Sequence, residues 1–366
     1  FNDTATTEIY TRWYSSAASD VYRDSSTSEW AAMHVFVPKP GRPQELRVTA
    51  DLRGLNTRVV PDSYPMTDPR EVIDWAAGFR IYSLFEITDG FWNIVLSKEC
   101  RHLTAIRTVM GLYQYCTLPQ GSIVSMAVFS RQVRKILQGD PAVRSYVDDI
   151  ILASDSPEQH LKDLERILTK LSDAGVRLKI EKAKIGVSQV DLLGLTVSHT
   201  KIEISEKHHK QVAQWEAPAT GHDLLRFLGL CNWLSDHLPN YAKVARPLYN
   251  ILKGIKFAKK SSHRPVLIPE YAEKWGAEQD GSFLQLKALI AKAIPLAPPR
   301  SDMPYYVYTD ASDVGLGGIL MQLRAGATEV EKLSFKDLRP IMCVSRTLNG
   351  AEVNYTVTEK ECLAIL

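Results

Sequence analysis

The sequence predicts an α+β fold, in which antiparallel hairpins form the sheets and amphipathic helices cover them. Two observations support this class. Apolar, β-branched segments recur in pairs joined by short turns, as in residues 143–152 and 192–204, and such pairs are typical of hairpins. Near the end of the chain, in residues 305–361, three strand-like segments come first and a helix follows, an order typical of α+β domains.

The composition is that of an ordinary globular protein. The 366 residues are enough for two or three domains, and 45% of them are hydrophobic and 23% charged. A net charge of +2 is too small to indicate a nucleic-acid partner by itself. No apolar run approaches about 18 residues and no basic-then-apolar leader is present, so we expect neither a membrane span nor a signal peptide. The five cysteines show no CxxC spacing, which favours reduced thiols in an intracellular compartment over a zinc site.

The N-terminal part begins with a polar stretch. Residues 1–29 are rich in Ser and Thr, so we expect an arm with little core of its own. Two strands are predicted next, near residues 35–37 and 46–53. Lys39 and Arg47 of this hairpin are cations that suit a triphosphate, although a solvated hairpin surface explains them equally well.

A buried strand is predicted at residues 81–87, with one acid, Glu86, near its end. Such an acid is either a metal ligand or an edge residue whose carboxylate reaches solvent, and the second is more common. Asp89 lies three positions further on, so strand alternation directs it to the opposite face. Residues 103–116 then predict a hairpin, which is followed by a helix ending at Leu137.

Two adjacent carboxylates, Asp148 and Asp149, interrupt an apolar, β-branched stretch. The pattern predicts a hairpin with one strand up to Val147, a tight turn at the two Asp residues and a second strand from Ile150. Like charges at a strand end repel each other unless a cation lies between them, and oxygen ligands suit a hard ion such as Mg²⁺. An isolated Asp pair is more simply a solvated turn, so the assignment of a metal site depends on the rest of the chain.

The clearest helix is predicted after Ser156, which suits the N-cap, with Pro157 in the first turn and Gln159 completing a capping box. Gly175 ends this helix, which we expect to cover the sheet, and a strand is predicted at residues 176–180. The apolar stripe of the helix consists of Leu161, Leu164, Ile167, Leu168 and Leu171.

The remaining elements follow the same local rules. Strands at residues 192–197 and 202–204 form a hairpin, and helices are predicted between Thr220 and Leu252. The lysines in residues 253–260 fit either a solvated linker or a segment that follows a phosphate backbone. Residues 265–304, rich in Pro and Ala, are expected to be a connection.

The last segment combines strands with two well-placed acids. Strands are predicted at residues 305–310, 315–320 and 341–345, and Asp310 ends the first of them. Thr356 and Glu359 then form a capping box for a helix that carries Glu361.

Taken together, these stretches resemble the reverse transcriptase and RNase H portion of gypsy-type LTR retrotransposon polyproteins, over residues 30–366. Each motif is a modest signal alone, but eight of them in the family's order are highly specific. They are residues 51–56 (DLRGLN), 85–91 (FEITDGF), 118–121 (LPQG), 146–149 (YVDD), 193–198 (LGLTVS), 226–230 (RFLGL), 309–312 (TDAS) and 358–361 (TEKE).

The resemblance implies a right-hand polymerase of fingers, palm and thumb with an antiparallel palm sheet, followed by a partial RNase H-like α/β domain. Because the chain opens at Phe1 and stops at Leu366 inside an expected helix, we expect a piece of a longer polyprotein. The expected divisions are 1–29, a polar N-terminal arm; 30–196, fingers and palm; 197–255, primer grip and thumb; 256–300, a connection; and 301–366, a truncated RNase H-like domain.

The resemblance also implies roles for the acids. Glu86, Asp148 and Asp149 would hold two Mg²⁺ ions, with Mn²⁺ as the alternative, one activating the primer 3′-hydroxyl and the other neutralising the leaving pyrophosphate. Asp310 and Glu361 match the first two metal-binding acids of an RNase H site.

Further residues would bind the nucleotide. Arg47, with Lys39 as a helper, would hold the incoming triphosphate, and Gln120 would brace nucleotide and template. Phe91 would be the steric gate that excludes a ribose 2′-hydroxyl and so favours dNTPs. The alternative for Phe91 is a packed core aromatic.

The same resemblance implies the partners. They are an RNA template, a DNA or tRNA primer and dNTPs, with the primer held by a primer grip at Leu193 and Gly194. The protease and integrase of the polyprotein would lie outside this chain. We expect no membrane association and a location inside the cell, in a cytoplasmic virus-like particle.

The chain departs from the family pattern at several positions. The family has Asp where this chain has Glu86, and one extra methylene moves the carboxylate outward, although Mg²⁺ demands near-ideal octahedral geometry. Misplacement by about 1 Å can cost on the order of 10²-fold in rate. Gln120 replaces a Phe usual in gypsy elements, Met126 replaces a Pro, and the RNase H segment ends before its other two acids.

Three functional hypotheses follow. The first is an Mg²⁺-dependent RNA-directed DNA polymerase with an incomplete hybrid ribonuclease domain. The second is a catalytically impaired remnant of the same fold that binds primer-template, motivated by Glu86. The third is an unrelated metal-dependent phosphoesterase that uses the Asp pair, which leaves Arg47, Phe91 and Gln120 unexplained.

Overall fold

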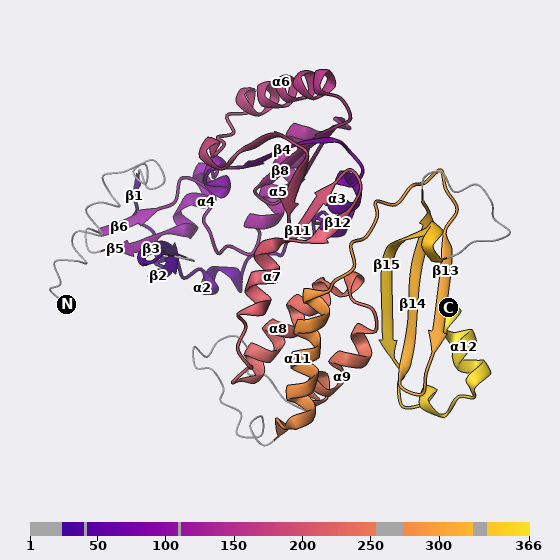
Figure 1. The fold of residues 1–366 in the computed structure, drawn as a ribbon. Helices are drawn as coiled ribbons and strands as arrows, with labels where there is room; N and C mark the ends of the chain where they lie inside the picture. Colours follow the sequence, from indigo (N-terminus) through magenta and orange to yellow (C-terminus); the bar gives the residue numbers. More distant parts are fainter. Residues whose placement is uncertain (1–23, 40–41, 109–110, 254–273, 325–334) are drawn as a thin grey trace. The chain divides into compact units, whose positions relative to one another are not determined.

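The computed structural model describes residues 24–39, 42–108, 111–253, 274–324 and 335–366. Two units are distinguished along the chain, one formed by residues 1–72 and 81–187 and the other by residues 73–80 and 188–366. Both mix helices with antiparallel sheets, so the α+β class is confirmed (Figure 1). Among the described residues, none of the helices has the length and apolar character that crossing a bilayer requires.

The first unit is built on a four-stranded antiparallel sheet with the strand order β7-β8-β4-β9. Residues 150–153 of β8 are all buried, because consecutive side chains point to opposite faces of a sheet that is covered on both. The strands are β4 (Ile81–Glu86), β7 (Val143–Tyr146), β8 (Asp149–Ser154) and β9 (Lys184–Val187).

Two helices, α5 (Ser125–Leu137) and α6 (Pro157–Asp173), pack on this sheet (Figure 1). The hydroxyl of Ser156 accepts a hydrogen bond from the backbone N–H of Gln159 at 3.2 Å, which confirms the predicted N-cap. The predicted stripe is wrong at Leu161, whose exposed fraction is 67%. The buried face of α6 instead includes two polar side chains, His160 and Asp163.

The strand predicted at residues 176–180 is also wrong. Leu178 forms only an isolated bridge with Ile87, and a 3₁₀ helix, η4 (Ile180–Lys182), follows. The backbone N–H of Lys179 donates to the carbonyl of Glu86 at 2.9 Å, so this segment runs antiparallel beside the end of β4 but pairs with it at a single position. The fourth strand, β9, was not predicted.

The N-terminal strands form two smaller sheets. One has the order β1-β6-β5, with β1 (Asp24–Ser25), β6 (Gly111–Gln114) and β5 (Ile106–Thr108), and the other is the predicted hairpin of β2 (His34–Lys39) and β3 (Arg42–Ala50). Short helices α2 (Arg53–Asn56), α3 (Pro69–Ala76) and α4 (Lys98–Arg101) follow.

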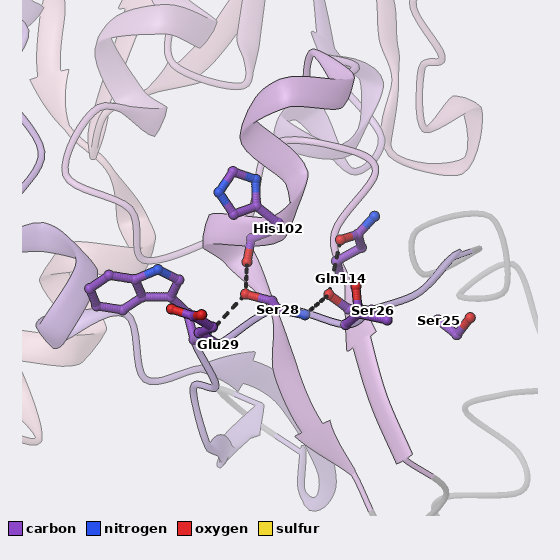
Figure 2. Close-up of a pocket in the computed structure, with 8 residues that line it drawn as sticks. Ser25, Ser26, Ser28, Glu29, His102 and Gln114 are labelled. Atoms are coloured by element: carbon purple, nitrogen blue, oxygen red, sulfur yellow. Dashed lines mark hydrogen bonds between the residues drawn. The ribbon is translucent and has the colours of Figure 1, made fainter.

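A polar pocket of about 460 Å³ lies beside β1 (Figure 2). The hydroxyl of Ser28 donates to the carbonyl of His102 at 2.7 Å, and that of Ser26 donates to the side-chain oxygen of Gln114 at 3.1 Å. Residues 24–29 of the expected arm are therefore attached to this sheet, whereas residues 1–23 lie outside the described part. The pocket contains none of the site residues expected from the sequence, and we assign it a structural role.

The second unit begins with a small sheet of order β10-β11-β12. A single strand was predicted over residues 192–197, but a turn at Leu193 and Gly194 divides it into β10 (Gln189–Leu192) and β11 (Leu195–Ser198). Strand β12 (Ile202–Ile204) pairs with β11 as predicted.

Within the described residues, four α-helices lie between this sheet and the last three strands: α7 (Glu206–Ala213), α8 (Gly221–Trp233), α9 (Tyr241–Leu252) and α11 (Ala277–Ala291). Helices α8 and α9 confirm the helical prediction between Thr220 and Leu252. Helix α7 was not predicted, and α11 lies within residues 265–304, where we expected only a connection. Residues 254–273, which include most of the lysine-rich run, lie outside the described part.

The chain ends in the predicted meander of three strands and a helix. Strands β13 (Tyr306–Ala311), β14 (Gly315–Leu323) and β15 (Leu338–Thr347) form an antiparallel sheet, and α12 (Val357–Ile365) contacts β13. Thr356 and Glu359 form the predicted reciprocal capping box at the start of α12.

A charged cluster ties α6 to the loop before β7 in the first unit. The guanidinium of Arg166 donates to the carboxylate of Asp140 at 2.8 Å and pairs with Asp163 at 2.7 Å, while Lys170 reaches Asp140 at 3.2 Å. The Asp140 side chain is only 2% exposed. Hydrogen bonding from Arg166 lowers the pKa of Asp140 to about 2, so the folded state favours its ionised form.

Replacing Arg166 by Met is expected to lower the free energy of unfolding by about 2 kcal/mol, because a buried carboxylate loses its main donor. In the parent chain, the contribution of Asp140 is fully present above the ordinary pKa of an aspartate and is lost as the pH falls toward about 2. Urea unfolding at pH 7 and pH 3 measures both effects, with Arg177→Met as the control. Equal losses in the two variants would contradict this account.

Candidate active site

The acidic residues of the first unit meet where β4 ends and β8 begins. Glu86, the last residue of β4, lies directly opposite Asp149, the first residue of β8. Residues that face each other across an antiparallel pair project from the same side of the sheet. The backbone N–H of Ile87 also donates to the carbonyl of Asp148 at 2.8 Å. Three carboxylates from two separate segments are thus brought to one end of the sheet.

The turn between β7 and β8 is one residue earlier than predicted. Tyr146 pairs with Asp149, so the turn consists of Val147 and Asp148. Val147 has a φ of 52°, in the left-handed region that β-branched residues rarely adopt. Such strain persists only where the surrounding structure imposes it, and it concentrates at functional sites.

Electrostatic repulsion is strong at this end of the sheet. Burial, followed by the negative charges of Glu86 and Asp148, raises the pKa of Asp149 above its ordinary value. Lys182 and Lys179 oppose this shift without cancelling it. The site therefore holds more negative charge than its protein surroundings neutralise, a condition that favours binding of a cation.

Two lysines hold the carboxylate of Glu86. Lys182 Nζ donates to Glu86 Oε2 at 2.7 Å, and Lys179 Nζ donates to Oε1. Burial of Glu86 opposes ionisation, but the hydrogen bonds from the two lysines outweigh it and lower the pKa of Glu86. Sequence reasoning did not assign these lysines, because their local spacing carries no signal of the contact.

The donor set suits a hard divalent ion, but Glu86 is engaged elsewhere. Within the described residues, no group of three or more His, Cys, Asp or Glu side chains is placed to hold a metal ion. Asp148 and Asp149 carry carboxylate oxygens, the type of ligand that Mg²⁺ prefers. The carboxylate of Glu86 joins them only by leaving its lysine partners.

Gly90 forms the wall of the site behind Asp148. A Cβ atom at Gly90 would lie 2.6 Å from Asp148 Oδ1 and 2.7 Å from the ring of Phe129. Phe91 packs edge-on against Phe129 with ring centroids 5.3 Å apart, and it contacts the core beneath the sheet. This contact fits the core-aromatic alternative for Phe91, and its expected role as a steric gate stays a prediction.

The loop that carries Gln120 is held by a residue to which no role was assigned. Asn56 donates to the carbonyl of Gly121 and accepts from the N–H of Ile123, both at 2.9 Å. Gln120 itself is half-buried beside this contact. Asn56 is the last residue of the motif at residues 51–56, and its place in that motif was the only indication of a role in the sequence.

The expected triphosphate ligands lie on the β2–β3 hairpin. Lys39 ends β2, and Arg47 pairs with Val37 across the hairpin. Their side chains lie outside the described part, so their nucleotide-binding role stays a prediction.

In the second unit, the turn expected to be the primer grip is braced by two helices. Leu193 and Gly194 both have positive φ, 53° and 90°. His208 Nδ1 donates to the carbonyl of Gly194 at 2.9 Å, and Trp233 Nε1 donates to that of Leu193 at 3.1 Å. The two bracing side chains were not identified from the sequence.

The two acids expected for a ribonuclease site lie on neighbouring elements of the same unit. Asp310 is exposed on β13, opposite Gly317 of β14, and Glu361 is half-buried on α12, which contacts β13. Their joint role in binding metal stays a prediction.

Two family models match the chain. Residues 37–197 match "Reverse transcriptase (RNA-dependent DNA polymerase)", and residues 275–366 match "RNase H-like domain found in reverse transcriptase". Residues 37–197 therefore form a reverse transcriptase domain. The first match contains Glu86, Asp148 and Asp149. The second contains Asp310 and Glu361.

Curated relatives of the chain are retrotransposon polyproteins. Over 90% of its length, the chain is 31% identical to the retrovirus-related Pol polyprotein from transposon opus of Drosophila melanogaster. The match covers 32% of that polyprotein. Over 89% of its length, the chain is 29% identical to the Pol polyprotein from transposon gypsy of the same organism. The match covers 30% of that polyprotein. The chain thus spans about a third of these relatives, and the expected membership in LTR retrotransposon polyproteins is confirmed.

Solved structures show the same fold. The chain superposes on a foamy viral protease-reverse transcriptase in complex with double-stranded DNA with a TM-score of 0.82 and 22% identity, covering 100% of this chain and 59% of the other. The same viral protein in complex with an RNA/DNA hybrid gives a TM-score of 0.78, also at 22% identity, covering 100% and 46%. At this identity the likeness establishes the reverse transcriptase fold.

Replacing Gly90 by Ala is expected to lower the free energy of unfolding by about 1–3 kcal/mol, because the new methyl group has no space between Asp148 and Phe129. Gly54→Ala is the matched control, since nothing lies within 4 Å of a Cβ atom there. Urea unfolding of the two variants measures the difference. Equal stabilities would show that the close packing behind Asp148 is absent.

Proposed function

We propose that the chain is an RNA-directed DNA polymerase that extends a primer on an RNA template. The observation that carries the proposal is the convergence of Glu86, Asp148 and Asp149 at one end of the β4–β8 pair, inside the residues that match the reverse transcriptase family. The unrelated phosphoesterase is set aside because it does not account for this family match.

In this proposal, Asp148 and Asp149 hold two divalent ions, Mg²⁺ or alternatively Mn²⁺, with Glu86 as a third ligand once it is released from its lysines. When bound, such ions lower the pKa of the primer 3′-hydroxyl and neutralise the leaving pyrophosphate. The turn strain at Val147 and the close approach of Gly90 keep Asp148 in place. Preorganised ligands of this kind avoid a reorganisation cost during the reaction.

Other residues bind and orient the substrates. Arg47 and Lys39 bind the triphosphate of the incoming dNTP, Phe91 excludes a ribose 2′-hydroxyl, and Gln120 braces the nucleotide against the template. Bringing the reactants together in this way converts a bimolecular step into an effectively unimolecular one.

The remaining parts serve the same reaction in a longer protein. The turn at Leu193 and Gly194 positions the primer strand, whether DNA or tRNA, and Asp310 and Glu361 supply acids to an RNA–DNA hybrid ribonuclease site. The polyprotein relatives support further domains in a longer parent protein, and we expect a protease and an integrase among them and a location in an intracellular virus-like particle.

A second candidate is a primer-template-binding form of the same fold that polymerises slowly. The two ion pairs of Glu86 favour it, because a carboxylate held by Lys179 and Lys182 is a poor ligand for a metal ion.

Asp148→Asn is expected to lower Mg²⁺-dependent incorporation of dTTP on poly(rA)/oligo(dT) by about 10²-fold or more, because an amide neither carries the charge nor fully replaces the metal ligand. The matched control is Asp173→Asn, at an exposed position near the end of α6. Retained incorporation in the Asp148 variant, or an equal loss in the control, would refute the proposed function.

Glu86→Asp separates the two candidates. If the parent chain is an efficient polymerase, the shorter side chain is expected to change the initial rate of primer extension by less than about tenfold. A rise of about tenfold or more would instead select the slow form, because it would show that Glu86 places its carboxylate unfavourably.

A further inference from the structure

The second unit contains a basic pocket that none of the roles above explains. We use the name basic pocket for a cavity of about 510 Å³ lined by Lys201, Arg324 and Arg339 together with residues 295–297 and two further side chains. It lies where β14 ends and β15 begins, since the backbone N–H of Arg324 donates to the carbonyl of Asp337. Among the described residues, none of the side chains that line it is acidic.

One of its cations has unsatisfied donors. Nε and Nη2 of Arg339 are enclosed by protein, and within the described residues neither has a hydrogen-bond partner. Enclosing a charged donor without an acceptor is costly, because the group has lost its water without gaining another partner. Burial, then the neighbouring charges of Arg300 and Arg324, lower the pKa of Arg339.

Two nearby carboxylates are already engaged, one by a cation of the pocket and one by a cation beside it. Lys201 pairs with Glu203 at 2.7 Å, and Arg300 pairs with Asp302 at 2.6 Å. Arg324 Nε donates to the carbonyl of Leu338 at 3.1 Å, a neutral acceptor that leaves the charge uncompensated. The pocket therefore collects positive charge without an anion among the described side chains that line it.

We propose that the basic pocket binds a phosphate group, supplied by the sugar–phosphate backbone of a nucleic acid. Guanidinium groups form bidentate hydrogen bonds with phosphate, and Arg339 lines the cavity with two donors that have no partner among the described residues, so binding would turn these donors toward the phosphate. No aromatic ring or amide side chain lines the pocket, so it has no group to stack on a base or read its edge. Such a contact positions a strand without reading its sequence.

The proposal takes its partner from the proposed function but does not require polymerisation. The test is binding of a poly(rA)/oligo(dT) duplex in EDTA, without nucleotides, at several salt concentrations. Arg339→Gln is expected to reduce the slope of log affinity against log salt by about 0.9, the value for one lost phosphate contact. Arg300→Gln is the matched control. It removes an equal positive charge beside the pocket, but Arg300 is already paired with the carboxylate of Asp302. Its slope is expected to change by less than half as much.

The melting temperature distinguishes a phosphate-binding role of Arg339 from a purely structural one. Arg339→Gln is expected to retain the parent melting temperature or raise it, since an enclosed charge is removed. A clear fall in melting temperature with an unchanged slope would overturn the proposal and indicate an internal partner for Arg339. If this variant fails to fold, Arg324→Gln provides the same slope measurement, because Arg324 also lines the pocket and its Nε donates to a neutral carbonyl, and an unchanged slope there also overturns the proposal.

Inorganic phosphate identifies the source of the anion. Phosphate is expected to raise the melting temperature of the parent chain more than that of Arg339→Gln. If phosphate stabilises the parent chain in this way but Arg339→Gln leaves the slope of log affinity against log salt unchanged, the pocket binds free phosphate. That outcome would overturn the assignment to a nucleic-acid backbone. Loss of polymerase activity alone leaves the proposal standing, because all these measurements are made without catalysis.

Discussion

The antiparallel register between β4 and β8 is the constraint on which the active site depends. Glu86 lies opposite Asp149, and the backbone N–H of Ile87 donates to the carbonyl of Asp148. Backbone pairing therefore brings the acids together. A slip of one residue would move every side chain of β8 to the other face of the sheet. The buried residues 150–153 resist such a slip, so the hydrophobic core also maintains the position of the acids.

The charge that this register concentrates is only partly balanced by the protein. Lys179 and Lys182 neutralise Glu86, whereas burial and repulsion still raise the pKa of Asp149. The same fold thus holds one carboxylate in ion pairs and keeps the aspartates ready for a cation. In the proposed function, competition between lysine and metal for Glu86 would separate an efficient polymerase from a slow one.

The features predicted correctly from the sequence depend on local chemistry. Ser156 and Thr356 mark helix starts because their hydroxyls satisfy backbone donors within one turn. The turn before Asp149 came one residue earlier than predicted, since strand pairing imposes on Val147 a conformation that its side chain disfavours. The contact of Lys179 with Glu86 spans 93 positions and has no local signal. Helix α11 was missed because Gly281 lies inside it and prolines follow, two features typical of a connection.

The central claim concerns where divalent ions bind. The most direct measurement is anomalous diffraction from crystals of the chain with primer-template, a dNTP and Mn²⁺. The account predicts Mn²⁺ peaks within bonding distance of the carboxylates of Asp148 and Asp149, beside the end of β4. Peaks that lie elsewhere while Asp148 and Asp149 remain without metal would contradict it.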